Sequence, residues 1–138
     1  MDGKPQDFMT VGLVHFMAYP AVMKGEGLIL ETLGAVCEDG YFGAVEVTAI
    51  RDAQVRKDAI ALVREKGLAV GFGAQPLLLA GKHNLSSSAP DARRAAVDAA
   101  LRALDEAIEW NAAGFAVLSG PDPGPELRQV EKSCMVAS

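Results

Sequence analysis

This chain of 138 residues has few cysteines, no long apolar run and no excess of positive charge. Its two cysteines, Cys37 and Cys134, are widely separated and match neither a disulfide framework nor the spacing of a metal site. The sequence therefore predicts no disulfide scaffold and no cysteine-based metal centre. A reduced, cytoplasmic setting is the expectation that follows from this use of cysteine.

The other two absences exclude classes of partner. No apolar stretch reaches the roughly 18 residues that a membrane-spanning helix needs. The first residues, MDGKPQD, are polar and hold no apolar segment of the kind found in secretory signals. The formal net charge is −5, with the charges distributed through the helical segments. We therefore expect no membrane partner and no nucleic-acid partner, because phosphate contacts require clustered positive charge.

An alternation of strand-like and helix-like segments is present instead. Hydrophobic residues make up 50% of the chain and charged residues 22%, which suits a buried core and argues against disorder. Four apolar, strand-like runs cover Val11–Ala18, Ala44–Ile50, Leu68–Ala74 and Phe115–Ser119. Amphipathic helical patterns separate them. Strands that alternate with helices indicate βαβ units and a parallel sheet, so the predicted class is α/β.

Three helices are expected between these strands, each with recognisable ends. The first carries apolar residues at helical spacing from Ile29 and ends at Asp39-Gly40. The second begins after Asp52, a good N-cap residue, and ends at Lys66-Gly67. The third is capped by Ser88 or Ala89 and starts at Pro90. Its predicted buried stripe is formed by Val97, Leu101, Leu104 and Ile108.

The spacing of the strands suggests a closed architecture that is only partly present. Successive units average about 35 residues, so eight units would need about 280 residues, close to the size of a (β/α)₈ barrel. We therefore predict a partial (β/α)₈ TIM barrel with about four parallel strands and three helices. This domain would cover residues 1–128, and residues 129–138 would form an irregular tail. A truncated or frame-shifted gene would produce such a tail, and so would a short protein with a frayed end.

An open four-stranded sheet also has consequences for association. Its two edge strands have unpaired backbone groups that can pair with another chain or segment. A homo-oligomer through the open sheet edges is therefore one expected way of covering them.

Polar residues near the strand ends are the candidates for function, because parallel α/β sheets bind ligands at the carboxyl ends of their strands. Alternation in the second strand places Glu46 and Thr48 on one face and Val45 and Val47 on the other. A carboxylate in an apolar strand is costly unless it is paired or bound. Glu46 is therefore a candidate ligand-binding residue, with a structural carboxylate as the alternative.

The other strands contribute further candidates. His15 lies near the end of the first strand, where it can bind a hydroxyl group or serve as a core residue. The third strand has glycines at 71 and 73, which leave room for a ligand, and Gln75 at its rim. The long segment 76–88 contains Asn84 and is predicted to cover the site as a loop. Ser119 follows the fourth strand and begins a Gly/Pro turn.

These segments together resemble the sugar phosphate isomerase/epimerase family of xylose-isomerase-like TIM barrels. The resemblance rests on VGLVHFMAYP, AVEVT, GFGAQP followed by HNLSSS, the run from Arg94 to Ile108, and VLSGPDPG. It covers residues 10–128, which correspond to the N-terminal half of such a barrel. In that family His15, Glu46, Gln75 and Asn84 match positions that line the substrate pocket.

The resemblance implies an enzyme that isomerises or epimerises a sugar or polyol by metal-assisted proton transfer. A divalent ion (Mn, Mg, Co or Zn) is expected for the whole family barrel, but its ligands come from later strands and none is assigned in this chain. The substrate-binding residues are expected to be His15, Glu46, Gln75, Asn84 and Ser119, and no catalytic residue is assigned.

Two other interpretations are compatible with the sequence. One is a non-catalytic domain of α/β type that binds a small ligand or another chain. The other is a flavodoxin-like domain, which needs only a few parallel strands and has helices on both faces of an open sheet. Fold analogy alone does not decide among them.

Overall fold

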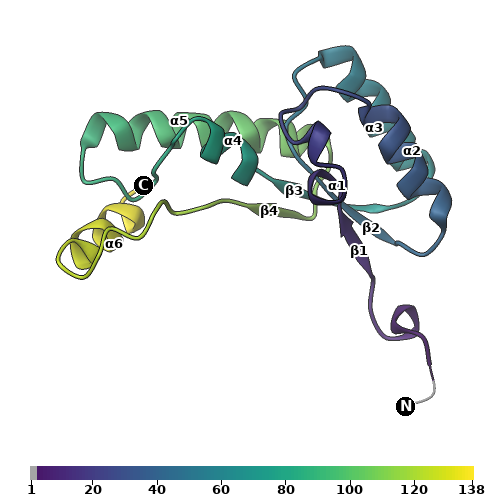
Figure 1. Ribbon diagram of the computed structural model, residues 1–138, viewed down its shortest axis with the longest axis horizontal. Helices are drawn as coiled ribbons and strands as arrows, with labels where there is room; N and C mark the ends of the chain where they lie inside the picture. Colours follow the sequence, from purple (N-terminus) through teal and green to yellow (C-terminus); the bar gives the residue numbers. More distant parts are fainter. Residues whose placement is uncertain (1–2) are drawn as a thin grey trace.

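The computed structural model describes residues 3–138 and shows an α/β fold with one all-parallel sheet of four strands (Figure 1). The strands are β1 (Gly12–Val14), β2 (Ala44–Val47), β3 (Ala69–Gly73) and β4 (Gly114–Ala116). They lie side by side in chain order, β1-β2-β3-β4. One register row runs across the whole sheet through Val14, Glu46, Gly71 and Gly114. The predicted α/β class and parallel sheet are confirmed.

Six α-helices occur among the described residues. They are α1 (His15–Ala18), α2 (Ile29–Asp39), α3 (Ala53–Glu65), α4 (Gln75–Ala80), α5 (Pro90–Glu109) and α6 (Arg128–Val136), with short 3₁₀ turns at Pro5–Asp7 and Pro20–Val22. The three predicted helices correspond to α2, α3 and α5. Within residues 3–138, none of these helices combines the length and apolar character needed to cross a bilayer.

The ends of α2 and α3 follow from the residues that the sequence places there. The Asp52 carboxylate accepts hydrogen bonds from the backbone amides of Gln54 (2.8 Å) and Val55 (2.9 Å), which satisfies two donors at the start of α3. Gly40 and Gly67 follow the two helices with φ of 73° and 72°, in the left-handed region that glycine adopts most easily.

All three long helices pack on one face of the sheet. One buried cluster joins strand residues Val45, Val47, Val70 and Phe72 to residues of α2 (Ile29, Leu33, Val36), α3 (Ala59, Val63) and α5 (Ala103, Ala107). Helices α2 and α3 also lie side by side (Figure 1). A flavodoxin-like sheet has a different strand order and helices on both faces. The observed order and one-sided packing do not fit that interpretation.

The opposite face of the sheet carries almost only small residues. Alternation places Gly12, Ala44, Ala69, Gly71, Gly73, Gly114 and Ala116 there, together with Val14 and Glu46. Gly12, Ala69 and Gly114 are exposed. We call this surface the open face, and Glu46 is the one carboxylate that β1–β4 place on it.

Several segment predictions were wrong in detail. The strands are shorter than predicted, and the second half of the predicted first strand forms helix α1. The segment 76–88, predicted to be a loop, contributes most of α4. Residues 129–138, predicted to be irregular, form nearly all of α6. Helix α6 packs through Met135 against a second buried cluster of Leu78, Leu85, Ala96 and Ala99. The apolar partner of Met135 is distant in sequence, so spacing within the tail does not reveal it.

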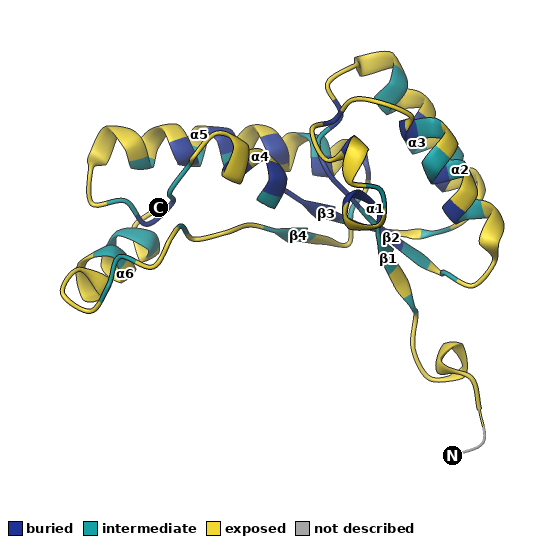
Figure 2. Ribbon diagram, in the orientation of Figure 1, coloured by how far each residue is buried: buried dark blue, intermediate teal, exposed yellow. Residues whose placement is uncertain are grey.

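The predicted buried stripe of α5 was also wrong. Leu101, Leu104 and Ile108 have 53%, 38% and 68% of their surface exposed, and Val97 is partly buried. The buried residues are instead Ala96, Ala99, Ala103 and Ala107, on the side of the helix that faces α4 and the sheet (Figure 2). Small side chains let α5 approach its neighbours closely. The larger apolar residues therefore form an exposed flank, which we call the α5 flank: Leu101, Leu104 and Ile108.

Candidate functional site

Glu46 and Gln75 meet on the open face, above Gly73. A Cβ atom added to Gly73 would lie 2.5 Å from Gln75 Oε1, 2.6 Å from Glu46 Oε1 and 2.9 Å from Cζ of Phe16. Two oxygen acceptors and one aromatic edge therefore surround a position that only glycine can occupy without displacing them. Gly73 itself is buried, and the side chains of Glu46 and Gln75 are partly exposed.

Three elements bring these side chains together. Glu46 projects from β2 because the alternate residues Val45 and Val47 are buried in the helix-side core. Gln75 is the first residue of α4, which begins directly after β3. The connection is held by a hydrogen bond from the Ala74 amide to the Ala116 carbonyl on β4 (2.9 Å). The two functional groups thus sit at the carboxyl ends of neighbouring parallel strands.

Neither of the two oxygens receives a hydrogen bond from a residue in the described range. Gln75 Oε1 is buried and accepts no hydrogen bond from any residue in the described range 3–138. None of the ion pairs formed within that range includes Glu46. A buried amide oxygen without a partner costs about 1–3 kcal/mol. A ligand that brings hydroxyl donors would satisfy both oxygens once the Gln75 amide turns toward it, since Gln75 Oε1 is buried in the unbound chain.

His15 lies elsewhere, in the helix-side core. Its Nε2 atom is 2.8 Å from Oγ1 of Thr32, whose hydroxyl also contacts the Leu28 carbonyl (2.8 Å). Only 4% of the His15 surface is exposed, and burial lowers the pKa of His15 to about 4. We therefore treat His15 as a neutral residue of the core and leave it out of the proposed site.

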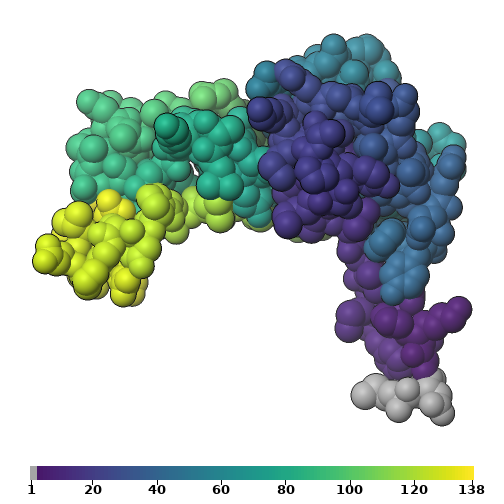
Figure 3. Space-filling view, viewed as in Figure 1, coloured from purple at the N-terminus to yellow at the C-terminus, as the bar shows by residue number. Residues whose placement is uncertain are grey.

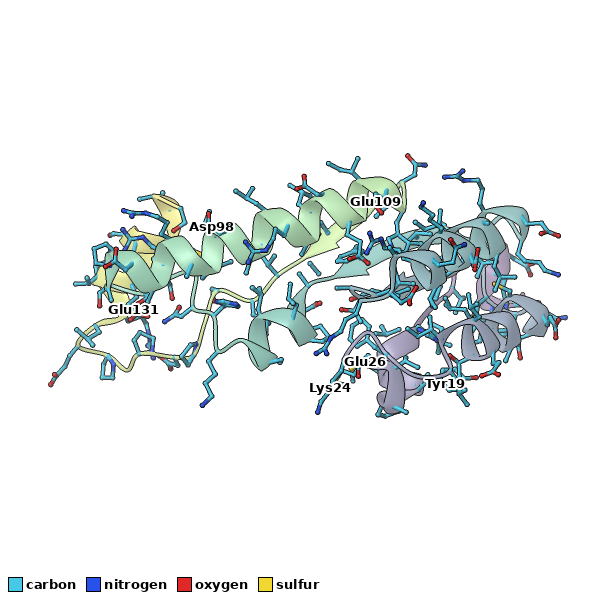
Figure 4. The ribbon with its side chains drawn as sticks, turned by 90° about the horizontal axis from the view of Figure 1, so that it is seen from above. Tyr19, Lys24, Glu26, Asp98, Glu109 and Glu131 are labelled. Carbon is cyan, nitrogen blue, oxygen red and sulfur yellow. The ribbon has the colours of Figure 1, made fainter. Side chains whose placement is uncertain are left out.

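Asn84 and Ser119 form a separate cluster beyond the end of β4. Asn84 Oδ1 accepts hydrogen bonds from the amide (2.9 Å) and hydroxyl (2.8 Å) of Ser86. The Ser119 carbonyl accepts a hydrogen bond from the same Ser86 amide (2.9 Å). The Ser86 hydroxyl also reaches Glu131 on α6 (3.2 Å). In Figure 4 Glu131 lies at the opposite end of the molecule from Tyr19, whose ring is in tilted contact with that of His15. The five predicted site residues thus fall into three groups.

The sequence did not predict the hydrogen bonds that connect the segment after β2 to α5. The backbone amide of Ile50, just beyond β2, donates to Glu106 Oε1 on α5 (2.9 Å). Arg56 donates to the Ile50 carbonyl (3.0 Å) and to Glu109 Oε2 (2.9 Å). Glu109 is labelled in Figure 4 at the end of α5 nearest to α3. Burial raises the pKa of Glu106, while the Ile50 amide and the Arg56 charge act in the opposite direction. The link fixes the segment after β2 against α5.

The side chains of residues 3–138 form no cluster that fits metal ligation. No group of three or more His, Cys, Asp or Glu side chains lies close enough to hold an ion within residues 3–138. Near Glu46 the described neighbours are an amide oxygen and an aromatic ring. We therefore derive no chemical step through a metal here.

Comparisons with known proteins do not assign the chain to a family. No protein-family model matches its sequence, and no curated protein is similar enough to count as a relative.

Proposed function

We propose that the chain binds a sugar or polyol on the open face, with Glu46 and Gln75 accepting hydrogen bonds from ligand hydroxyl groups. The observation that carries this proposal is the convergence of two donor-free oxygens over Gly73. Polyols offer several hydroxyl donors on adjacent carbons, which suits two acceptors that flank one small residue.

The glycines around the site support a ligand of this size. Gly71 and Gly114 lie in the same register row as Glu46, so their lack of side chains leaves space beside the carboxylate. In a filled barrel interior, bulky side chains would occupy such positions. Space beside the sheet and two hydrogen-bond acceptors therefore coincide at the carboxyl ends of β2 and β3.

We further propose that the sheet is half of a (β/α)₈-type barrel of the sugar isomerase/epimerase kind. The sequential order of the strands and the packing of α2, α3 and α5 on one face support this. In that setting Glu46 is placed to remove or return a proton at a carbon next to a bound hydroxyl. The described residues 3–138 offer no ligand set for the divalent metal of such an enzyme, so this proposal routes no step through one.

Closure of the barrel by a second copy is part of the same proposal. The edges of β1 and β4 are both free within the four-stranded sheet, and the α5 flank lies on the side of α5 away from Arg56 and α3. A twofold-related copy would place its β1 beside β4 and its β4 beside β1, so that both edges pair in parallel. Two Glu46 carboxylates would then face one interior.

A non-catalytic ligand-binding domain is the second candidate. It is favoured by the single carboxylate on the open face, because isomerases that move a proton between carbons commonly use more than one acid–base group. We keep the reduced, cytoplasmic setting as a proposal, in keeping with the two free thiols.

Titration with sugars tests the binding proposal. D-xylose, D-fructose, D-glucitol and myo-inositol are added to ¹⁵N-labelled protein, and the amide signals of Glu46, Gly73 and Gln75 are followed by NMR. We expect at least one compound to shift these signals at millimolar concentration, and Glu46→Gln to weaken its binding about tenfold, as expected for loss of a charge-assisted hydrogen bond. Glu31→Gln, on an exposed part of α2, is the matched control. If none of the four compounds moves these signals, the proposal is wrong.

Solvent deuterium distinguishes the two candidate functions. The bound sugar is incubated in D₂O with Mn²⁺ or Mg²⁺, and incorporation of deuterium at carbon is measured by mass spectrometry. Incorporation that disappears in Glu46→Gln supports the isomerase/epimerase proposal. Binding without incorporation supports the non-catalytic domain.

A further inference from the structure

A separate cleft lies beyond the carboxyl ends of β3 and β4. Its volume is about 520 Å³, within the range of small-molecule sites. It is lined by Leu78, Leu79, Lys82, His83, Asn84, Leu118, Gly120 and Pro121. Glu46 and Gln75 do not line it, so it is distinct from the sugar site proposed above. Its walls are largely leucine and proline, and its polar residues include one lysine but no carboxylate.

Lys82 occupies an unusual backbone position at the rim of this cleft. It follows α4 with φ of 52°, in the left-handed region. The amide of His83 donates to the Leu78 carbonyl (2.9 Å), and the amide of Lys82 donates to the Leu79 carbonyl (3.1 Å). These two bonds define a Schellman motif with Lys82 at the position where glycine is most common.

Two other helices of the same chain end in this way with favourable residues. After α3, Gly67 takes the left-handed position, with φ of 72°. After α5, Asn111 takes it, with φ of 51°. Lysine gains nothing from this conformation, since it has neither the freedom of glycine nor the local hydrogen bonding of asparagine. Strain of this kind at the edge of a cleft points to a role for the side chain in binding.

His83 is held beside Lys82 by the small size of Gly81. A Cβ atom on Gly81 would overlap the His83 ring. The half-buried imidazole therefore packs over the end of α4, in the wall of the cleft. It adds a ring N–H donor next to the lysine charge.

We propose that this cleft binds a small organic anion with an apolar body. The charge of the ligand pairs with Lys82 and accepts a hydrogen bond from His83, and its apolar body packs against Leu78, Leu79 and Leu118. Complementarity of charge and of apolar surface selects this class over neutral polyols, which lack a charge, and over cations, which Lys82 repels. The anion can be a phosphate monoester or a carboxylate.

Four probes separate the parts of this proposal. Phenyl phosphate and phenylacetate carry the apolar body with each type of anion, benzyl alcohol carries the body without charge, and inorganic phosphate carries charge without the body. Binding is measured by NMR of the leucine methyl groups and the His83 ring. We expect one or both of the aromatic anions to bind at least about tenfold more tightly than benzyl alcohol and inorganic phosphate. Equal binding of benzyl alcohol would overturn the proposal.

Substitutions at Lys82 separate binding from folding. Lys82→Met removes the charge and keeps the strained position, whereas Lys82→Gly removes both. We expect both variants to weaken binding of the aromatic anion about tenfold. Lys82→Gly should also raise the urea midpoint of unfolding. Lys132→Met, on an exposed part of α6 outside the cleft, is the control. Unchanged binding by Lys82→Met would exclude the proposed role.

Glu46→Gln keeps this proposal distinguishable from the sugar site. If the two sites are separate, this variant loses binding of the polyol and keeps binding of the aromatic anion. Loss of both ligands in this folded variant would show that the cleft does not act as a separate site, and would overturn the proposal.

Discussion

The side-chain oxygens of Glu46 and Gln75 flank the same missing side chain, that of Gly73. Both lie within 2.6 Å of the point where its Cβ atom would be. Glu46 lies in β2 and Gln75 begins α4 just after β3. They are 29 positions apart in the chain and meet only because β2 and β3 are parallel neighbours. The glycine between them is therefore as much a part of the site as the two polar groups.

Replacement of Gly73 by alanine tests this relationship. We expect Gly73→Ala to displace both oxygens, to lower the free energy of unfolding by about 1–3 kcal/mol through overpacking, and to abolish polyol binding. The control is Gly71→Ala in the same strand, because its new Cβ atom would lie 3.6 Å from Glu46 Cγ, an ordinary contact. Urea unfolding compares the stability of the two variants, and NMR titration measures polyol binding by Gly73→Ala alone, because Gly71 borders the proposed ligand space. A Gly73→Ala protein as stable as Gly71→Ala would contradict the geometry.

The helix caps give a second prediction, about stability alone. Asp52 caps α3 with two hydrogen bonds, so Asp52→Ala should lower the free energy of unfolding by about 1 kcal/mol. Ala89 occupies the N-cap position of α5 with extended backbone and no side-chain acceptor. Ala89→Asp should therefore stabilise the protein by about 0.5–1 kcal/mol. Urea denaturation measures the free energy of unfolding of both variants. If both substitutions stabilised the protein, or both destabilised it, helix capping would not explain the changes.

Local patterns in the sequence predicted those parts of the fold that local chemistry determines. Asp52, Gly67 and the alternation around Glu46 each act on their immediate neighbours, and α2, α3 and β2 were located correctly from them. The side of α5 that is buried was not predictable in the same way. Its alanines face the core because other elements approach closely there, and the leucine stripe has the same helical period. Period alone does not distinguish the two sides.

In the candidate site, too, some residues were predictable from local sequence and others depended on distant contacts. Glu46 and Gln75 were predicted from strand alternation and strand ends, and the structure brings them together. His15 was placed in the same pocket because it lies near the end of a strand. The strand stops at Val14, however, and the ring turns into the core to reach Thr32. Where a strand changes into a helix depends on contacts with distant residues, which the local pattern does not contain.

The buried His15 predicts a dependence of stability on pH. The pKa of this residue is about 4 in the folded chain and 6.5 as the reference for the unfolded chain. Between these values the unfolded state binds more protons, so stability falls as the pH is lowered from 6.5 to 4 and levels off below. Above pH 6.5 the contribution of the neutral ring is fully present.

The variant His15→Asn isolates this contribution, because asparagine can still donate to Thr32 but does not titrate. We expect the free energy of unfolding of wild type to fall more than that of the variant when the pH is lowered from 7 to 4. His83→Asn, which removes the other histidine, is the control. Glu106, whose pKa is raised by burial, acts with opposite sign and is common to all three proteins. Parallel pH curves for wild type and His15→Asn would contradict the assignment.

The α5 flank gives the last prediction, about association. Ile108 has 68% of its surface exposed, and with Leu101 and Leu104 it forms an apolar strip on the side of α5 away from Arg56 and α3. In the closed barrel proposed above, this strip would be covered by the helical layer of a second copy. Helix α6 does not take that place, since Met135 packs at the other end of α5, where the α6 lobe is seen in Figure 3.

Sedimentation velocity at micromolar concentration tests this association. Wild type should sediment as a dimer, and Ile108→Lys should sediment as a monomer, because a buried lysine at the junction would lack a partner. Val136→Lys is the matched control, since Val136 is an even more exposed apolar residue (84%) on α6, away from the α5 flank. This variant should remain dimeric. A wild-type monomer, or equal dissociation of both variants, would show that the open edges are not joined through α5.

The polyol affinity of Ile108→Lys then gives a further readout. If Glu46 of each copy faces a shared interior, the monomer should bind the sugar more weakly than the dimer, although Ile108 lies on the opposite side of the sheet from the ligand.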